Sequence, residues 1–525
     1  MSAELLRAAQ AALSRRDFAG ARRAAEQVLL DRPNDPGANQ VLGLVAIEQG
    51  DPAGALTFLR RADSAAPGQM HILNALGVAL RRTGAIAEAR SIFTRAGDLG
   101  LIDAWRNLGI LEANAGDANA ARIAYSNALA INGDDAPSHA GLSQAYELTH
   151  QLDLAREHAR KAVERDPNNE VAALTLANLL LREGNLAAAE VTAAAVARRS
   201  RSATNQALAW GLIGDVRDRS DDPGEAFAAF AEANRLLLSI HGSHLRETHL
   251  PYHPDGVERM IAFARWVDVS GWVAPTAEIS PVFLVGFPRS GTTLLEQVLS
   301  AHSRIVCIEE REHLALAAQK VAGNPEKLAE LSDAEIDSIR AEYWKRVGAE
   351  TEIRGRVVVD KLPLNVIFLP LIRRVFPDSK ILFALRDPRD VVLSCFQQRF
   401  GMNAAMVQFL ELNSAAAYYD KVMSLGLICR ERLGLSVFEV RYEDVVADLE
   451  KVARGVTSFL ELPFESSMLS PAEAALQRNI NTPSVRQVVQ PIYNRSVARW
   501  KKYEAQLAPV LPLLSDWAER LNYAR

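Results

Sequence analysis

The sequence has few cysteines, no long apolar run and little net charge, and each of these absences narrows the possible functions. Its 525 residues include only three cysteines, without the CxxC spacing or nearby histidine pairs of a zinc or redox site. So few cysteines favour a reducing compartment. No run approaches the roughly 18 apolar residues that span a bilayer, so no membrane attachment is expected. The formal net charge of −5 gives no general electrostatic footprint for nucleic acid, so an anion site must be built locally.

The beginning of the chain lacks the basic and then apolar pattern of a secretory signal. Arginines such as Arg7, Arg15 and Arg16 are typical of transit peptides, but Glu4 and Asp17 oppose that interpretation. We therefore expect a cytoplasmic protein. Because 525 residues exceed what one ordinary core can bury, we also expect at least two domains.

A repeat with a period of about 34 residues runs through the first half of the chain. In each of seven units a small residue is followed twelve positions later by an alanine. Two antiparallel helices approach closely only where the facing side chains are small, so each unit is predicted to be a helix pair. The small residues are Ala9, Gly43, Gly77, Gly109, Ser143, Ala177 and Gly214, and the turn between the helices is indicated by Gly50, Gly84, Gly116 and Gly184.

This pattern resembles the tetratricopeptide repeat, with about seven units over residues 3–238. The resemblance implies a superhelix with a concave groove that binds a peptide or a partner domain. An array that serves only as a spacer or a dimerisation surface fits the sequence equally well. The residues that line the groove are left open.

A connecting segment of mixed character, residues 239–278, contains four of the ten histidines. These histidines do not recur at i, i+4 with a carboxylate partner, as a metal site would favour. A linker that packs on both neighbouring domains is the preferred interpretation. The four residues are His241, His244, His249 and His253.

After Pro281 the pattern changes to short β-rich runs that alternate with helix-like sequence. This alternation predicts a parallel α/β sheet over residues 279–525, with ligands at the C-terminal ends of its strands. The predicted fold class is therefore an all-α solenoid followed by an α/β domain of the P-loop type. The β-rich runs are "PVFLVGF", "VVVDKLP", "SKILFALRDP" and "LSVFEVRYED".

The first of these runs leads into "GFPRSGTT", a turn of small residues before a helix, as in phosphate-binding loops. Thr292 stands where nucleotide hydrolases have a lysine that reaches for the γ-phosphate. The turn resembles the phosphosulfate-binding loop of the sulfotransferase family, whose donor is 3′-phosphoadenosine 5′-phosphosulfate (PAPS). The resemblance implies that the backbone N–H groups of Ser290, Gly291, Thr292 and Thr293 hold the 5′-phosphosulfate and that Arg289 supplies the missing positive charge.

A second element, "RDPRDVVLSCF", places Arg386 at a strand end and Ser394 eight residues later. In sulfotransferases the matching arginine and serine bind the 3′-phosphate of the donor. A salt bridge from Arg386 to Asp387 or Asp390 at the start of a helix is the simpler structural alternative. The spacing from the glycine-containing loop, about a hundred residues, favours the binding role.

Over residues 279–502 the likeness is to protein-tyrosine sulfotransferases, on "PRSGTTLLEQVLSAHSRIVCIEE", "VDKLPLNVIFLPLIRRVFPDSKILFALRDPRD", "VRYED" and "SVRQVVQPIYNRSVARW". This resemblance implies that Glu310 is the catalytic base. It also implies that Lys361, Ser484 and Arg289 stabilise charge at the transferring group, without a required metal. The implied nucleotide contacts come from Tyr442, Arg499 and the segment from Ser484 toward Asn494.

Other bases remain open at this point. Glu309 is less favoured than Glu310 because it can be solvated or pair with Arg311. His302 and His313 are also candidates, since cytosolic sulfotransferases use histidine.

The sequence departs from the tyrosine-directed pattern at several positions, so tyrosine is only one candidate among peptide, protein, glycan and small-molecule hydroxyls. The departures are Glu312 in place of a basic residue, Leu362 in place of an acidic one, Gln398 with Arg399 beside it in place of an arginine, and Val359 where a cysteine would pair with Cys307.

Two functions of other classes compete with sulfuryl transfer. A P-loop kinase or hydrolase needs an acidic magnesium ligand, for which Asp360 is the candidate nearby. An inactive scaffold would use only the repeats to bind partners. The joint presence of the charged and hydroxyl residues named above argues against lost activity.

Overall fold

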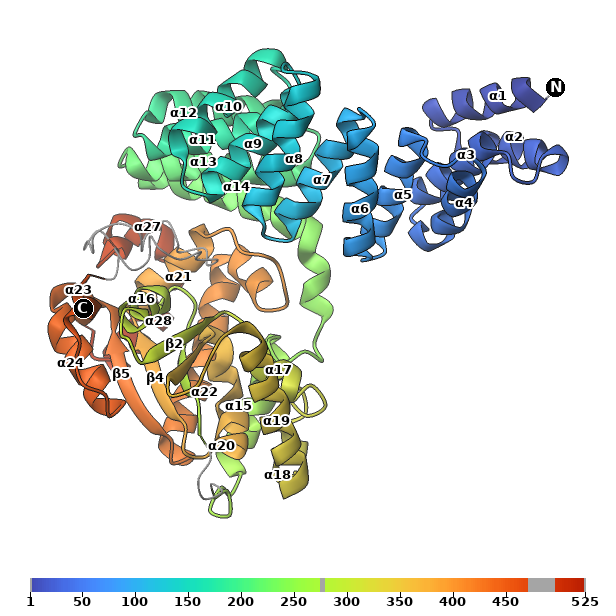
Figure 1. Cartoon of the computed structure of the whole chain (residues 1–525). Helices are drawn as coiled ribbons and strands as arrows, with labels where there is room; N and C mark the ends of the chain where they lie inside the picture. Colours follow the sequence, from blue (N-terminus) through green and yellow to red (C-terminus); the bar gives the residue numbers. More distant parts are fainter. Residues whose placement is uncertain (1, 274–278, 471–495, 524–525) are drawn as a thin grey trace. The chain divides into compact units, whose positions relative to one another are not determined.

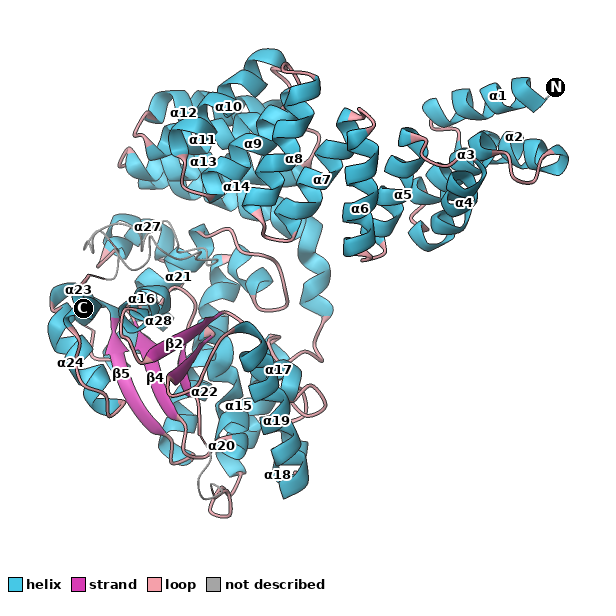
Figure 2. Cartoon of the chain, in the orientation of Figure 1, coloured by secondary structure: helices cyan, strands magenta, loops and turns pink. Residues whose placement is uncertain are grey.

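The computed structural model describes residues 2–273, 279–470 and 496–523. The chain forms two compact units, residues 1–201 and 202–525. In the described ranges the first unit consists of helices, and the second contains a sheet with helices around it (Figures 1 and 2).

Twelve described helices build the first unit, and consecutive helices pack against each other. They form six hairpins, one for each of the first six sequence repeats. The helices are α1 (Ser2–Ser14), α2 (Phe18–Asp31), α3 (Pro36–Glu48), α4 (Pro52–Ala65), α5 (Met70–Arg82), α6 (Ile86–Asp98), α7 (Ile102–Asn114), α8 (Ala118–Ile131), α9 (Ala136–Leu148), α10 (Leu152–Arg165), α11 (Glu170–Arg182) and α12 (Leu186–Arg199).

The small residues of the repeat lie where the two helices of a hairpin approach most closely. A Cβ atom added to Gly77 of α5 would lie 2.5 Å from the ring of Phe93 in α6. One added to Gly109 of α7 would lie 2.6 Å from the ring of Tyr125 in α8. A packed interior does not accommodate such contacts, so the sequence period records a packing requirement.

Glycine and aspartate fix the turns between the helices. Gly50, before α4, has a φ of +81°, a left-handed conformation that glycine adopts without strain. Asp51 follows it and caps α4, because its carboxylate accepts a hydrogen bond of 2.8 Å from the Gly54 N–H. Gly116 and Asp117 repeat this arrangement before α8.

The seventh repeat forms two longer helices, α13 (Ala203–Arg219) and α14 (Pro223–His241), which belong to the second unit. Phe227 of α14 stacks on Phe396 with ring centroids 4.8 Å apart. Asn234 Nδ2 donates a hydrogen bond of 2.9 Å to the Phe396 carbonyl oxygen. The boundary between the two compact units, after residue 201, therefore lies one hairpin before the end of the sequence repeat at residue 238.

A short 3-10 helix, η1 (Gly242–Arg246), and α15 (Pro254–Trp266) connect this hairpin to the sheet. His253 Nδ1 accepts a hydrogen bond of 3.1 Å from the Asp255 N–H, and its Nε2 donates one of 3.1 Å to the Leu245 carbonyl oxygen. Within the described ranges, no three potential metal-ligating side chains gather at one place. His253 thus has a structural role as the cap of α15.

A sheet of five parallel strands in the order β2-β3-β1-β4-β5 forms the centre of the second unit in its described part. With the helical hairpins, it confirms the predicted fold class. The strands are β1 (Val282–Gly286), β2 (Ile305–Glu309), β3 (Val357–Lys361), β4 (Lys380–Leu385) and β5 (Ser436–Arg441). The helices around them are α16 (Thr292–Ser300), α17 (His313–Ala317), α18 (Pro325–Glu330), α19 (Asp333–Glu350), η2 (Pro363–Phe368), α20 (Leu369–Val375), α21 (Pro388–Gln397), η3 (Met406–Leu410), α22 (Leu412–Arg432), α23 (Tyr442–Ala447), α24 (Leu449–Phe459), η4 (Ser466–Leu469), η5 (Arg499–Tyr503), α27 (Glu504–Leu507) and α28 (Leu511–Arg520).

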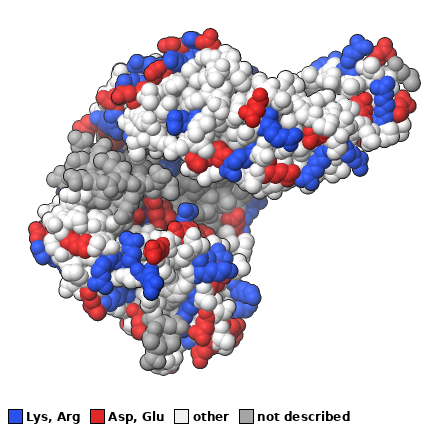
Figure 3. All heavy atoms as spheres, in the orientation of Figure 1, with Lys and Arg blue, Asp and Glu red and all other residues white. Residues whose placement is uncertain are grey.

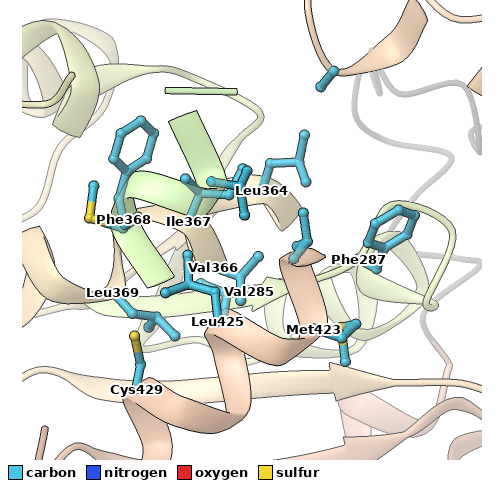
Figure 4. Close-up of a cluster of buried hydrophobic side chains, with 14 of the residues drawn as sticks. Val285, Phe287, Leu364, Val366, Ile367, Phe368, Leu369, Met423, Leu425 and Cys429 are labelled. Atoms are coloured by element: carbon cyan, nitrogen blue, oxygen red, sulfur yellow. The ribbon is translucent and has the colours of Figure 1, made fainter. Parts of the chain in front are cut away.

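Alternate residues of β1 face opposite sides of the sheet. Phe283 and Val285 join a core that includes η2 and α22, and Figure 4 shows Val285 among side chains of these helices. Leu284 joins a second core with α16 and α24. Burial on both faces is typical of parallel sheets, and it holds β1 firmly at the centre.

The surface offers no dominant charge on the face that Figure 3 shows, where basic and acidic side chains are interspersed. Across the described ranges, none of the helices combines the length and the apolar character needed to cross a membrane.

Candidate active site

The C-terminal edge of the sheet gathers most of the residues selected from the sequence. Arg289 lies in the loop after β1, Glu310 follows β2, and Lys361 ends β3. Arg386 follows β4 and Tyr442 follows β5. β1 lies where the strand order reverses, which is where ligands bind in open parallel sheets. Each of the five described strands therefore contributes to one candidate site.

The loop after β1 follows a course that larger side chains would obstruct. A Cβ atom on Gly286 would lie 2.5 Å from the carbonyl oxygen of Ala384 in β4. Gly291 has a φ of +89°, and a Cβ atom there would lie 2.7 Å from the ring of Tyr442. Arg289, with a φ of +70°, adopts a left-handed conformation that costs a non-glycine residue about 1–3 kcal/mol. Packing around the loop must hold this arginine in place.

Helix α16 begins directly after Gly291, so its N-terminus lies at the C-terminal edge of the sheet. Gly291 has no side chain to cap the helix, and the N–H groups of a first turn carry the positive end of the helix dipole. Thr292 and Thr293 are buried in this turn. The Ser290 N–H donates a hydrogen bond of 3.2 Å to the Phe287 carbonyl oxygen and closes the turn before the helix. This helix end is suited to an oxyanion.

Two arginines and a serine form the basic side of the site. Arg289 Nε donates a hydrogen bond of 3.0 Å to Ser394 Oγ in α21. Arg386, buried with 7% exposure, donates one of 3.0 Å to the Arg289 carbonyl oxygen. Its guanidinium lies 4.8 Å from the ring centroid of Tyr442. The structure thus brings together four residues that lie far apart in the sequence.

The charges on this side repel one another. Burial and the neighbouring Arg386 lower the pKa of Arg289 to about 10, and Arg499 adds to the effect. The guanidinium therefore stays charged at neutral pH, at a cost in free energy. A bound anion relieves such a cost, because it replaces repulsion by attraction.

Asp387 and Asp390, the acidic residues that follow Arg386, form their hydrogen bonds with other groups. Asp387 caps α21 and accepts hydrogen bonds of 2.9 and 2.7 Å from Arg389. Asp390 accepts a backbone N–H of the C-terminal segment at 2.7 Å. Arg386 donates instead to the Ser496 carbonyl oxygen at 2.6 Å, and its Nε has no hydrogen-bond partner among the described residues. Its hydrogen bonds thus go to carbonyl oxygens, and its charge also acts on the nearby Asp390, whose pKa burial raises to about 6 and Arg386 lowers in part.

Lys361 and two glutamates form the acidic side of the site. The fully buried Lys361 Nζ lies 3.0 Å from Glu310 Oε1 and 3.0 Å from Glu296 Oε2. Burial opposes the charge of Lys361, but the glutamates outweigh it and raise the pKa of the ammonium. Burial also raises the pKa of Glu296 to about 7, an effect that Lys361 only partly offsets.

The backbone of Glu310 is fixed as well as its side chain. Its φ is +47°, and its N–H donates a hydrogen bond of 2.8 Å to the Lys361 carbonyl oxygen. Its side chain remains 34% exposed, so the carboxylate can meet a group that arrives from solvent. Glu309, the last residue of β2, lies opposite Lys361 in the ladder between β2 and β3.

The two histidines considered as bases have different surroundings. His302 Nδ1 accepts the Arg304 N–H at 3.0 Å, and its Nε2 donates to the Pro463 carbonyl oxygen at 2.9 Å. Both of its ring nitrogens are therefore engaged in holding the chain. His313 is buried at the start of α17, with its Nε2 3.4 Å from Glu350 Oε1.

The C-terminal part of the predicted site is described in part. Ser484, with the segment that follows it toward Asn494, lies outside the described residues. Arg499 is described, and its guanidinium lies 2.8 Å from the Asp218 carboxylate of α13. The adjacent Trp500 N–H donates the 2.7 Å hydrogen bond to Asp390. Arg499 thus belongs to a segment tied to α21.

Two departures from the tyrosine-directed pattern can be located. Arg399, next to Gln398, forms an ion pair of 2.7 Å with Asp215 of α13. Cys307 faces Val359 across the β2–β3 ladder, and its thiol donates a weak hydrogen bond of 3.8 Å to the Glu296 carbonyl oxygen. The displaced arginine therefore has a carboxylate partner inside the second unit.

Sequence reasoning missed Glu296, Asp215 and Asp218. A signal existed for Glu296, because it is a lone acidic residue in the otherwise uncharged run "TTLLEQVLS" at the start of a helix. The two aspartates break the repeat pattern in its last unit, where they follow the small residue Gly214.

Comparisons with known proteins agree with this architecture. Residues 281–466 match the model of the sulfotransferase family, and residues 6–70 and 136–169 match tetratricopeptide repeat models. An uncharacterized protein of Aquifex aeolicus is 26% identical over 413 residues, which cover 74% of this chain and 52% of that protein. The chain thus spans about half the length of this relative.

Two further similarities concern one half of the chain each. A putative protein-tyrosine sulfotransferase of Caenorhabditis briggsae is 26% identical over 232 residues, 42% of this chain and 80% of that protein. A tetratricopeptide repeat protein of Parabacteroides merdae, known from a crystal structure, is 16% identical with a TM-score of 0.36 and covers 45% of this chain and 93% of its own. The family models decide the assignment: the chain combines tetratricopeptide repeats with a domain of the sulfotransferase family.

Proposed function

We propose that the protein transfers a sulfuryl group from PAPS to an acceptor hydroxyl. The observation that carries this proposal is the basic side of the site, Arg289 with Arg386 and Ser394, beside the N-terminus of α16. It supplies positive charge where the loop lacks a lysine. The match of residues 281–466 to the sulfotransferase family covers these residues and supports the proposal.

The two anionic ends of PAPS have different partners in this proposal. The first-turn N–H groups of α16 and Arg289 hold the 5′-phosphosulfate. Arg386 and Ser394 hold the 3′-phosphate. Support comes from Arg386, which is buried and whose Nε has no hydrogen-bond partner among the described residues. A charged donor in that state is unfavourable until an acceptor reaches it.

The acidic side supplies the proton acceptor. As the acceptor oxygen bonds to sulfur and the bond from sulfur to the phosphate oxygen breaks, Glu310 takes the hydroxyl proton. Arg289 and Lys361 stabilise the charge on the transferring group and on the leaving phosphate. When Glu310 becomes neutral, Glu296 still lies 3.0 Å from Lys361, and its ionised form supplies the buried ammonium with a counter-charge. The other product is adenosine 3′,5′-bisphosphate.

The acceptor we propose is a hydroxyl on a protein, peptide or glycan. Tyrosine is the first to test, because one relative is named a putative protein-tyrosine sulfotransferase. Glu312 stands where that group has a basic residue, which disfavours a strictly acidic peptide. The repeats are proposed to bring the acceptor or a partner protein, and the cytoplasmic location stays a prediction.

A P-loop kinase or hydrolase is the second candidate, but its acidic magnesium ligand is poorly placed. Asp360 precedes Lys361 on β3 and therefore points to the opposite face of the sheet. Its carboxylate accepts hydrogen bonds from Tyr343 at 3.0 Å and from Asn365 at 3.3 Å inside the core. That position does not serve a metal at the phosphate loop.

Product analysis tests the proposal. The full chain is incubated with PAPS labelled with ³⁵S and a lysate as the acceptor pool, and in parallel with ATP and magnesium. We expect release of adenosine 3′,5′-bisphosphate with transfer of the label, and no consumption of ATP. Consumption of ATP without release of the bisphosphate would favour the kinase or hydrolase, and neither reaction would favour an inactive scaffold.

A further inference from the structure

Helix α13, the first helix of the last repeat, presents aspartates to the C-terminal half of the chain. Asp215 pairs with Arg399 at 2.7 Å and Asp218 with Arg499 at 2.8 Å. The two aspartates are three residues apart, so they lie on one face of the helix. All four residues belong to the same compact unit.

This pair of carboxylates is particular to the last repeat. Asp215 and Asp218 stand one and four positions after the small residue of their unit, Gly214. The same two positions hold Asn178 and Leu181 in the sixth repeat. In the fourth repeat they hold Ile110 and Ala113. The packing of a repeat therefore does not require acids there.

Asp218 holds Arg499 in a partly buried position. The side chains are 22% and 28% exposed, and the buried Tyr503 donates a second hydrogen bond to Asp218 at 2.6 Å. Burial opposes the charge of Arg499, but Asp218 outweighs it, so the pKa of Arg499 is raised. Since Arg499 also repels Arg289, Asp218 offsets the charge that would otherwise drive Arg499 away from the other arginines.

The main chain around Arg499 is tied to the basic side of the site. Arg386 donates to the Ser496 carbonyl oxygen at 2.6 Å, and Trp500 donates to Asp390 at 2.7 Å. The side chain of Arg499 is thus held by Asp218 of α13. The backbone on either side of it is held by Arg386, which follows β4, and by Asp390 of α21.

We infer that Asp218 is a positioning residue of the donor site, which holds Arg499 for the nucleotide and makes the last hairpin of the repeats part of that site. This inference rests on the proposed function. Without Asp218, Arg499 is free to turn into solvent, and a donor must order its side chain on binding. The expected effect is therefore on donor affinity and not on the chemical step.

Binding of adenosine 3′,5′-bisphosphate to the full chain tests the inference by calorimetry. Asp218→Asn keeps the shape of the side chain and removes its charge, and we expect about threefold to tenfold weaker binding. In turnover, this variant should raise the KM for PAPS and leave kcat unchanged. Asp221→Asn is the matched control in the turn just after the same helix, because the exposed Asp221 carboxylate pairs with Lys502. Binding of the bisphosphate to this variant should stay within about twofold of the wild type.

A double-mutant cycle separates positioning from a general effect on folding. In an Arg499→Ala background, Asp218→Asn should cause no further loss of affinity for the bisphosphate. Unchanged or tighter binding by Asp218→Asn alone, or an equal loss in the Arg499→Ala background, would overturn the inference. If the wild type does not bind the bisphosphate at all, the proposed function fails instead, so the two failures are distinguishable.

Discussion

The two sides of the candidate site balance their charges in opposite ways. Over β2 and β3, the single ammonium of Lys361 lies between Glu310 and Glu296. Over β1 and β4, Arg289 and Arg386 donate hydrogen bonds to hydroxyl and carbonyl oxygens. The charge of Lys361 is balanced by glutamates of the protein itself. The charges of Arg289 and Arg386 are instead suited to an anionic ligand. In the proposed reaction, this difference favours the anionic donor on the arginine side and the acceptor hydroxyl on the glutamate side.

Removal of the proposed base, Glu310, tests the acidic side and carries the largest expected effect. Glu310→Gln should lower kcat by roughly 10²- to 10⁴-fold, because the amide cannot accept the hydroxyl proton. Affinity for adenosine 3′,5′-bisphosphate should stay within about twofold, since the arginine side is untouched. Initial rates and calorimetry on the same preparation measure both. Turnover that is undiminished in this variant would place the base elsewhere, with His313 the first alternative.

Removal of Arg386 tests the basic side. Arg386→Ala should weaken binding of adenosine 3′,5′-bisphosphate by about 30-fold or more, or about 2 kcal/mol, because a buried charged contact is lost. Affinity for adenosine 5′-monophosphate, which lacks the 3′-phosphate, should change less than about threefold. Calorimetry with the two nucleotides measures the difference. An equal loss for both would mean that Arg386 acts only by supporting the loop through the Arg289 carbonyl oxygen.

Replacement of Gly291, in the loop after β1, has a smaller expected effect, which is on stability. Gly291→Ala should lower the free energy of unfolding by about 1–3 kcal/mol, because its φ of +89° strains an alanine beside Tyr442. Gly348→Ala is the matched control: a Cβ atom in this part of α19 meets nothing within 4 Å, so the change should stabilise by about 0.4–1 kcal/mol. Urea denaturation compares the two variants. Equal stability of both would contradict the strained course of the loop.

The pH dependence of stability tests the buried carboxyl of the acidic side. Burial raises the pKa of Glu296 from 4.5 to about 7, so the folded protein binds its proton more tightly than the unfolded chain does. Glu296 therefore stabilises the fold fully below about pH 4.5, and this contribution is lost as the pH rises through about 7. Relative to Glu296→Gln, the wild type should lose on the order of 2 kcal/mol of unfolding free energy from about pH 5 to about pH 8.

Urea denaturation at several pH values measures this loss. Glu326→Gln, which makes the same change at an exposed position in α18, is the control for the substitution itself. A difference between Glu296→Gln and the wild type that does not vary with pH would contradict the raised pKa of Glu296.

The features that repeat along the chain could be predicted from the sequence. Gly77 and Gly109 recur in phase because each must accept an aromatic ring from the next helix. The loop that ends at Gly291 was recognisable because strand, small residues and helix are contiguous. In both cases local sequence carries the physical constraint.

The ion pairs of the site could not be predicted, because their partners come from distant parts of the chain. Glu296 is 65 positions from Lys361, and Asp218 is 281 positions from Arg499, without any spacing rule that links them. His302 remained a candidate base at the level of the sequence because nothing local shows that both of its ring nitrogens are bound. Only the fold reveals which charges are buried together.

Calorimetric titration of the full chain with adenosine 3′,5′-bisphosphate and with adenosine 5′-monophosphate tests the central claim most directly. In the proposed site, the helix N-terminus and Arg289 hold one anionic end of the donor, and Arg386 and Ser394 hold the other. The bisphosphate should therefore bind at least about 30-fold more tightly than adenosine 5′-monophosphate. Equal affinities for the two nucleotides would contradict the assignment of the arginine side to the donor.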